Sequence, residues 1–164
     1  MKHEGTKWRG VVAVIGTSEY DPLYYHYAEE IGTELAKRGV LVICGGRGGV
    51  MEAVCKGVKK AGGISVGILP GGLEEANQFV TVPVATFLGE ARNAIVAFAG
   101  QVVIAIGGGY GTLSEIALAL KMGKPVIALN TWRAVDPSGK ELPLIYVNSV
   151  SEAIQKIEEL LKLQ

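Results

Sequence analysis

The sequence feature that most limits the fold is a glycine-rich turn between a strand-like and a helix-like segment. Five apolar residues at 102–106 precede Gly107-Gly108-Gly109-Tyr110-Gly111-Thr112-Leu113-Ser114-Glu115, and apolar residues then recur at three- and four-residue spacing up to Lys121. A continuous apolar run of this length is typical of a strand buried on both faces, as in a parallel sheet. We therefore expect the glycines to end an inner strand and to begin a helix.

Glycines at this place favour binding of an anion. Open α/β sheets bind their ligands at the carboxyl ends of the strands, and glycine lets a ligand approach the backbone closely. The unpaired N–H groups of a first helical turn, with the helix dipole, attract a phosphate. We predict a phosphate site formed by Gly108, Gly109, Gly111 and Thr112, with Glu115 one turn above it.

The rest of the chain repeats the alternation of strand and helix. Strand-like segments at 10–15, 40–44, 64–69, 102–106 and 126–129 alternate with helix-like segments, one of them at 88–99. Weaker strands are predicted at 79–84 and 144–147. Asp21-Pro22 and Ser149-Val150-Ser151-Glu152 are typical helix starts. The pattern predicts an α/β fold: a Rossmann-like, doubly wound parallel sheet in three layers, with residues 1–164 as a single domain.

Composition excludes several classes of protein. Sixteen basic and sixteen acidic residues cancel without a basic cluster, so we expect no nucleic-acid partner. No apolar segment approaches the ~20 residues of a membrane helix, and residues 1–7 have no apolar signal core, so we expect no membrane association. Cys44 and Cys55 fall in a predicted strand and helix as buried free thiols, which favours a cytoplasmic location.

Two further strand ends carry glycine or hydroxyl residues, and neither fits a cofactor motif. No turn reads G-x-G-x-x-G or ends in Gly-Lys-Ser/Thr, and no acidic residue follows the second strand. No His, Cys and carboxylate cluster has metal-ligand spacing. We therefore expect no metal and no cofactor, and we predict ligand contacts from Gly16, Thr17, Ser18, Gly46, Arg47 and Gly48.

Three motifs in order resemble the LOG ("lonely guy") family, once labelled lysine decarboxylases, in a wider group that includes the molybdenum-cofactor carrier proteins. The motifs are residues 45–51, Glu90-Ala91-Arg92-Asn93 and residues 107–115, and the likeness runs from about residue 10 to the last helix. The resemblance implies a Rossmann-like sheet and a homodimer or higher oligomer. In the LOG branch it implies hydrolysis of nucleoside 5′-monophosphates to free base and ribose 5-phosphate.

The sequence departs from the LOG motifs at several positions. Gly107 stands where the family has Pro, Asn93 where it has Lys, and Ser114 where it often has a second Glu. The Met-His that precedes the arginine in the family is absent. These departures point toward the carrier-like branch. The resemblance places the catalytic residues at Arg92 and Glu115, and we predict Asn93 as a ligand contact.

Two hypotheses for function follow. In a phosphoribohydrolase, Glu115 would stabilise an oxocarbenium-like transition state or take a proton from water. Arg92 would position the substrate, lower the pKa of Glu115 and keep it ionised. The alternative is a non-catalytic binder or carrier of a nucleotide or a phosphorylated pterin. Lysine decarboxylation is rejected because no Schiff-base lysine site is recognisable.

Each candidate residue also has a structural interpretation. Glu115 could simply favour the start of its helix dipole, and Arg92 could be a solvated helix residue or pair with Glu90. Thr17 and Ser18 could cap a local turn. Tyr110 could be a wall of the pocket or a contact between subunits.

Overall fold

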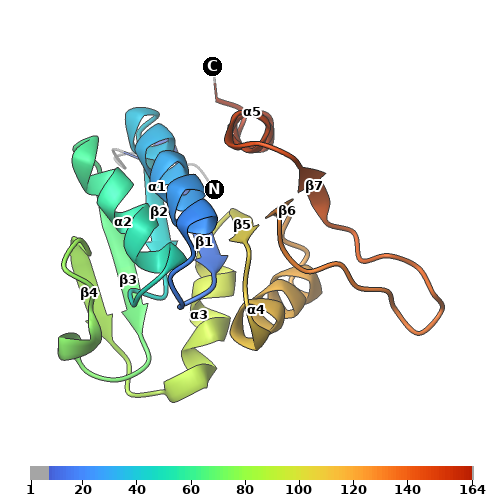
Figure 1. The fold of residues 1–164 in the computed structure, drawn as a ribbon, viewed down its shortest axis with the longest axis horizontal. Helices are drawn as coiled ribbons and strands as arrows, with labels where there is room; N and C mark the ends of the chain where they lie inside the picture. The colour runs from blue at the N-terminus through green and yellow to red at the C-terminus, as the bar shows by residue number, and fades with distance from the viewer. Residues whose placement is uncertain (1–7, 164) are drawn as a thin grey trace.

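Residues 8–163, which the computed structural model describes, form a seven-stranded parallel sheet in the order β4-β3-β2-β1-β5-β6-β7 (Figure 1). The predictions for residues 1–7, a missing signal core among them, lie outside the described residues. The strands are β1 (Gly10–Gly16), β2 (Val40–Cys44), β3 (Ser65–Leu69), β4 (Val82–Ala85), β5 (Val102–Ile106), β6 (Val126–Leu129) and β7 (Ile145–Val147).

Helices cover both faces of this sheet. They are α1 (Pro22–Lys37), α2 (Val50–Lys60), α3 (Arg92–Ala99), α4 (Tyr110–Lys121) and α5 (Val150–Leu161), with short 3-10 helices η1 (Leu73–Glu75) and η2 (Gly89–Ala91). One buried cluster joins α1, α2 and α5 to the sheet, and a second joins α3 and α4 to its opposite face. The predicted three-layer, Rossmann-like α/β fold is confirmed.

The strand order reverses beside β1. The chain moves from β1 through β2 and β3 to β4 at one edge, and α3 then carries it back to β5 on the other side of β1. At such a switch point the loops after the two central strands diverge and leave a crevice. The turns that follow Gly16 and Ile106 are therefore brought to the same place, because β1 and β5 pair in parallel up to these residues.

The two residues predicted to begin helices, Asp21 and Ser149, act as N-caps in the structure. Asp21 Oδ1 accepts hydrogen bonds from the amides of Leu23 (2.9 Å) and Tyr24 (3.1 Å) at the start of α1. Ser149 Oγ accepts from the amide of Glu152 (3.1 Å) at the start of α5. Cap side chains thus satisfy two free N–H groups at the start of α1 and one at the start of α5.

Two predicted boundaries differ from the structure. The strand expected at 79–84 is the edge strand β4 at 82–85, because the pairing just before it runs through side chains. Thr81 N donates to Ser65 Oγ (3.2 Å), and Ser65 N donates to Thr81 Oγ1 (3.1 Å). The helix expected at 88–99 is divided into η2 and α3, so Glu90 lies on a 3-10 turn and Arg92 opens the α-helix.

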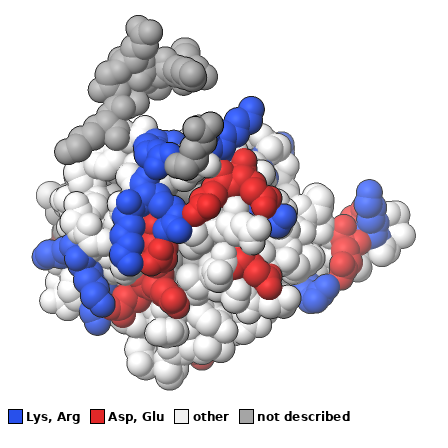
Figure 2. All heavy atoms as spheres, turned by 90° about the horizontal axis from the view of Figure 1, so that it is seen from above, with Lys and Arg blue, Asp and Glu red and all other residues white. Residues whose placement is uncertain are grey.

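The surface charges and the buried cysteines agree with the predictions from composition. Figure 2 shows one face on which Lys and Arg lie interspersed with Asp and Glu. No helix in residues 8–163 is long and apolar enough to cross a bilayer. As predicted, Cys44 and Cys55 are buried free thiols, and their sulfurs lie 3.5 Å apart. The hydrogen bond with Cys55, together with burial, raises the pKa of Cys44.

Candidate functional site

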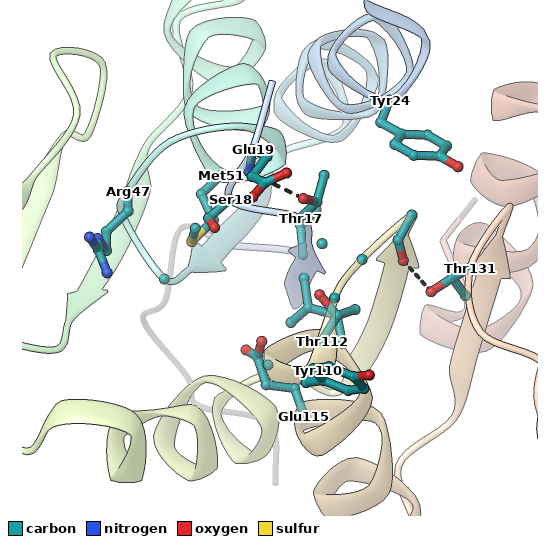
Figure 3. A pocket seen from close by; sticks show the side chains of 18 of the residues that line it. Thr17, Ser18, Glu19, Tyr24, Arg47, Met51, Tyr110, Thr112, Glu115 and Thr131 are labelled. Atoms are coloured by element: carbon teal, nitrogen blue, oxygen red, sulfur yellow. Dashed lines mark hydrogen bonds between the residues drawn. The ribbon is translucent and has the colours of Figure 1, made fainter. Parts of the chain in front are cut away.

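A cavity of about 830 Å³ opens at the carboxyl ends of β1 and β5, at the switch point of the sheet (Figure 3). The loops after β1, β2, β5 and β6 line it together with the start of α3. Eleven of the thirteen predicted site residues lie in its wall: Gly16, Thr17, Ser18, Arg47, Arg92, Asn93, Gly108, Gly109, Gly111, Thr112 and Glu115. Gly46 and Gly48 lie outside this lining.

The turn after β5 presents a row of free amides to the cavity. Within residues 8–163, none of the N–H groups of residues 108–112 donates a hydrogen bond, and the first α4 amide that does is Leu113 N, to Gly109 O (3.1 Å). Gly109 has no neighbouring heavy atom within 4 Å of the place a Cβ would occupy. Amides at a helix N-terminus attract an anion both by hydrogen bonding and through the helix dipole. We call residues 108–112 the amide cradle.

The start of the turn is held by neighbouring loops. Gly107 has φ +59°, and a Cβ there would lie 2.6 Å from Cδ2 of Tyr24, so the tyrosine ring rests directly on this glycine. Gly107 N donates to Asn130 O (3.1 Å), and Thr131 Oγ1 donates to Gly107 O. The backbone of the turn is thus fixed from both α1 and the loop after β6.

Arg92 is buried against the cavity and oriented by its neighbour. Its Nη1 donates to Asn93 Oδ1, and its side chain is only 7% exposed, which excludes a solvated helix residue. In turn, Asn93 Nδ2 donates to Ser114 Oγ (3.1 Å), and Ser114 Oγ donates to Gly111 O (2.7 Å). A continuous hydrogen-bonded path therefore joins the guanidinium to the amide cradle.

This path explains two departures from the LOG motif together. Asn93 and Ser114 replace a Lys and a Glu of the family and contact each other across α3 and α4. The polar groups of Asn93 are bonded to neighbouring side chains, with Nδ2 also near Glu90 Oε2 (3.5 Å). Asn93 thus lines the cavity while its amide orients other residues.

The charge state of Glu115 differs from the expectation. Glu115 is only 6% exposed, and burial raises the pKa of its carboxyl to about 8, a shift that Arg92 opposes and Glu90 reinforces. Arg92 lowers this pKa as predicted, but burial outweighs it, so the prediction that Glu115 stays ionised is wrong. No ion pair joins the two side chains in the described part of the chain, so the guanidinium does not offset the loss of water around the carboxyl.

The polar side chains in the turns after β1 and β2 are less available to a ligand, because they contact the protein itself. Thr17 Oγ1 accepts from Glu19 N (3.1 Å), the local turn cap that the sequence left open. Arg47 lies at the rim of the cavity, and its Nε is 3.8 Å from Glu75 Oε2. Gly46 packs against the backbone of Gly67 and the side chain of Leu69.

Sequence reasoning missed part of the cavity wall. Tyr24 comes from α1, and Asn130, Thr131 and Trp132 follow β6. The signal for the second group was present, because strands that pair in parallel end at the same edge and 126–129 was predicted to be a strand. Glu90, which belongs to the second motif but was not predicted as a ligand contact, also lines the cavity.

In chemical terms the site can accept an anion and hold a neutral carboxyl beside it. The amide cradle and Arg92 supply donors and positive charge, while Glu115 supplies a proton that can be lost near neutral pH. No group of three or more His, Cys, Asp and Glu side chains among residues 8–163 could hold a metal ion.

Fold and site together define a Rossmann-like α/β protein with a ligand cavity at its switch point. The chain belongs to the SLOG cluster4 family, whose model matches residues 9–154. The resemblance to the LOG family and to its molybdenum-cofactor carrier branch is thereby confirmed.

Two solved structures show the likeness in three dimensions. The molybdenum cofactor binding protein from Rippkaea orientalis is 33% identical with a TM-score of 0.84, over 94% of this chain and 99% of that one. The molybdenum cofactor carrier protein from Chlamydomonas reinhardtii is 34% identical with a TM-score of 0.80, over 93% and 98%.

A plant protein represents the enzymatic branch. A rice protein (Oryza sativa subsp. japonica), named as a probable cytokinin riboside 5′-monophosphate phosphoribohydrolase, is 33% identical over 116 residues. The match takes in 68% of this chain and 47% of the rice protein, so the chain aligns with about half the length of that relative.

Proposed function

We propose that this protein binds a phosphorylated small molecule, a nucleotide or a phosphorylated pterin, and holds it unchanged as a carrier. The observation that carries the proposal is the row of free amides at residues 108–112 facing the same cavity as Arg92. The buried Nε of Arg92 has no hydrogen-bond partner within residues 8–163. A buried donor without a partner is costly, and an anion in the cavity would satisfy it.

The state of Glu115 also supports a carrier. With a pKa of about 8, most of this carboxyl is protonated at neutral pH and cannot stabilise a developing positive charge. The replacement of Lys and Glu by Asn93 and Ser114 removes two further charges from the environment of Arg92. The likeness to carrier proteins, over more than nine-tenths of each chain, agrees with this interpretation.

A second candidate function is hydrolysis of the N-glycosidic bond of a nucleoside 5′-monophosphate. One observation favours it: Glu115 lines the same cavity as the amide cradle, and its pKa lies near neutrality. Groups tuned in this way are effective general acids. The protonated carboxyl would donate its proton to the departing base as the C–N bond breaks. Water would add to the sugar carbon and release a proton that restores the carboxyl, which yields free base and ribose 5-phosphate.

One experiment separates the two candidates. Calorimetric titration with AMP, GMP and a phosphorylated pterin is combined with chromatographic detection of free base. A carrier binds at least one of these compounds and releases no base. A hydrolase releases base from the wild type and loses this activity in Glu115→Gln, while the surface variant Glu159→Gln retains it. Failure of all the phosphorylated compounds to bind would contradict both candidates.

Arg92 provides the matched test of anion binding. Because a charge-assisted hydrogen bond is worth about 1.5–3 kcal/mol, we expect Arg92→Ala to weaken affinity for the bound compound by roughly tenfold or more. Arg92→Lys keeps the charge but loses the planar fork, so its affinity should lie between those of the wild type and the alanine variant.

We also propose a homodimer or higher oligomer and a cytoplasmic location. Apolar side chains exposed on α3 and at the end of α4, namely Ile95, Phe98 and Met122, support an interface with a second copy. Light scattering gives the oligomeric state, and Phe98→Glu should reduce it if this face is used. The unlinked thiols of Cys44 and Cys55 support a reducing compartment, which cell fractionation tests.

A further inference from the structure

Tyr110 occupies an unusual position for an aromatic side chain. It is the first residue of α4 and belongs to the amide cradle, yet its side chain is 85% exposed. This is the largest exposed fraction of any large hydrophobic side chain within residues 8–163. Its ring also lines the cavity, beside Glu115 and Thr112 (Figure 3).

Trp132 supports this ring from the loop after β6. The two ring centroids are 5.9 Å apart with an angle of 31° between the ring planes. The indole Nε1 donates to Gly109 O (2.9 Å), so the orientation of the tryptophan is fixed on the backbone of the amide cradle itself. The two aromatic residues therefore form a pair in which Trp132 is held by the backbone and Tyr110 is exposed to solvent.

The aromatic pair and the amide cradle are parts of one unit. Residues 130–132 contact the turn through three hydrogen bonds: Gly107 N to Asn130 O, Thr131 Oγ1 to Gly107 O, and Trp132 Nε1 to Gly109 O. A ligand anchored by its phosphate at the amides would thus meet the aromatic pair at a fixed place. Aromatic faces of this kind bind planar heterocycles by stacking, with little dependence on the identity of the ring.

We infer that Tyr110 and Trp132 form a stacking platform for the planar heterocyclic ring of a ligand whose phosphate occupies the amide cradle. This inference rests on the proposed function and adds the ligand's ring to it. The chemical class is a purine, pyrimidine or pterin joined to a phosphate by a short linker. A phosphorylated sugar without a ring system fills only the cradle and leaves the platform unused.

The test compares ligands with and without the ring. AMP and a phosphorylated pterin carry it, and ribose 5-phosphate has the phosphate alone. By calorimetry, Tyr110→Ala should weaken binding of the ring-bearing compound by roughly tenfold and leave the affinity for ribose 5-phosphate unchanged. Tyr110→Phe should restore the affinity, and Tyr146→Ala, which removes a tyrosine on β7, should have no effect. The comparison of AMP with the pterin identifies the preferred ring.

A spectroscopic measurement locates the ring independently. The chain has two tryptophans, and Trp8 lies just before the amino end of β1, whereas the cavity lies at the carboxyl end of that strand. In Trp8→Phe the emission comes from Trp132 alone, and we expect AMP to change it saturably and more strongly than ribose 5-phosphate does. Trp132→Phe, with Trp8 retained, should show no change with either compound.

Four results would overturn the inference. Tyr110→Ala could weaken AMP and ribose 5-phosphate equally, which would place Tyr110 in the fold of the cradle only. It could leave the affinity for AMP unchanged and alter the oligomeric state, which would make Tyr110 a subunit contact. If no phosphorylated compound bound the wild type, the proposed function would fail and this inference with it. If ribose 5-phosphate bound as tightly as AMP and the pterin, only the stacking platform would be refuted.

Discussion

Two glycine-rich turns at the same edge of the sheet use their glycines in opposite ways. In the turn after β2, Gly49 has φ +61° and a Cβ there would overlap the carbonyl oxygen of Thr17, while Gly46 N donates to Cys44 Sγ (3.4 Å). In the turn after β5, Gly109 has open space around it and the amides of 108–112 remain free among the described residues. Glycine content is the same signal in both turns, and the space around the glycines distinguishes them: Gly46 and Gly49 are closely packed, whereas Gly109 is open.

The largest effect is expected in the closed turn. Gly49→Ala combines a left-handed backbone angle with a clash against the Thr17 carbonyl, so the free energy of unfolding should fall by about 3 kcal/mol. For a chain of this length that lowers Tm by roughly 10 °C. Differential scanning calorimetry measures the change, and an unaltered Tm would show that this turn is as open as the one after β5.

The next effect concerns the carboxyl above the open turn. The folded-state pKa of Glu115, about 8, lies above its ordinary value of 4.5, so the folded state keeps a proton that the unfolded state releases. Stability from this group is therefore present at low pH and is lost as pH rises toward 8. At about 1.4 kcal/mol per pKa unit, the wild type should lose about 2 kcal/mol between pH 6 and 8 that Glu115→Gln does not lose. Parallel pH dependences in chemical denaturation would refute the buried, protonated carboxyl.

A smaller effect is expected in the hydrogen-bonded path behind the open turn. Asn93→Ala removes bonds to Arg92 and Ser114, and we expect a loss of about 1.5 kcal/mol in stability with weaker ligand binding. Ser114→Ala should cost about 1 kcal/mol. Because the two side chains bond to each other, urea denaturation of the double variant should show a loss smaller than the sum. Strict additivity would mean that the path does not act as a unit.

The smallest effect on stability is expected in the open turn itself. At Gly109 the backbone angles, φ −101° and ψ −156°, suit any residue, and a Cβ meets no atom within 4 Å. Gly109→Ala should therefore change the free energy of unfolding by less than about 0.5 kcal/mol. The added methyl group would nevertheless obstruct the approach of a phosphate, so calorimetric titration should show weaker binding of ribose 5-phosphate. A drop in Tm as large as that of Gly49→Ala would remove the distinction between the turns.

Local rules in the sequence predicted most of the fold. The apolar run at 102–106 is β5 with every residue buried, and Asp21 and Ser149 begin their helices through side-chain caps. These features depend on neighbours within a few residues, so they can be read from a single chain. The shift of β4 to 82–85 depends on the partner residue Ser65, sixteen positions away from Thr81, and periodicity carries no sign of it.

The positions of the site residues could be predicted from the sequence, whereas the pKa of Glu115 could not. The glycines after β5 and the Arg92 and Glu115 motifs lie around one cavity, because parallel strands bring their carboxyl ends to one edge. The raised pKa of Glu115 follows from its burial, which depends on how the helices pack. It reversed the expectation that a neighbouring guanidinium would keep this carboxyl ionised. Likewise, no sequence signal distinguished Gly46, which packs inside, from Gly109, which faces the cavity.

The backbone angle at Gly107 has a consequence for how related chains are compared. Proline cannot adopt a φ of +59°, because its ring holds φ at about −65°. A chain with the P-G-G form of the LOG motif therefore could not have this backbone conformation at the first position. Two chains that align letter by letter through the rest of the motif can thus enter it along different routes. A search pattern that demands the leading proline would pass over sequences built like this one.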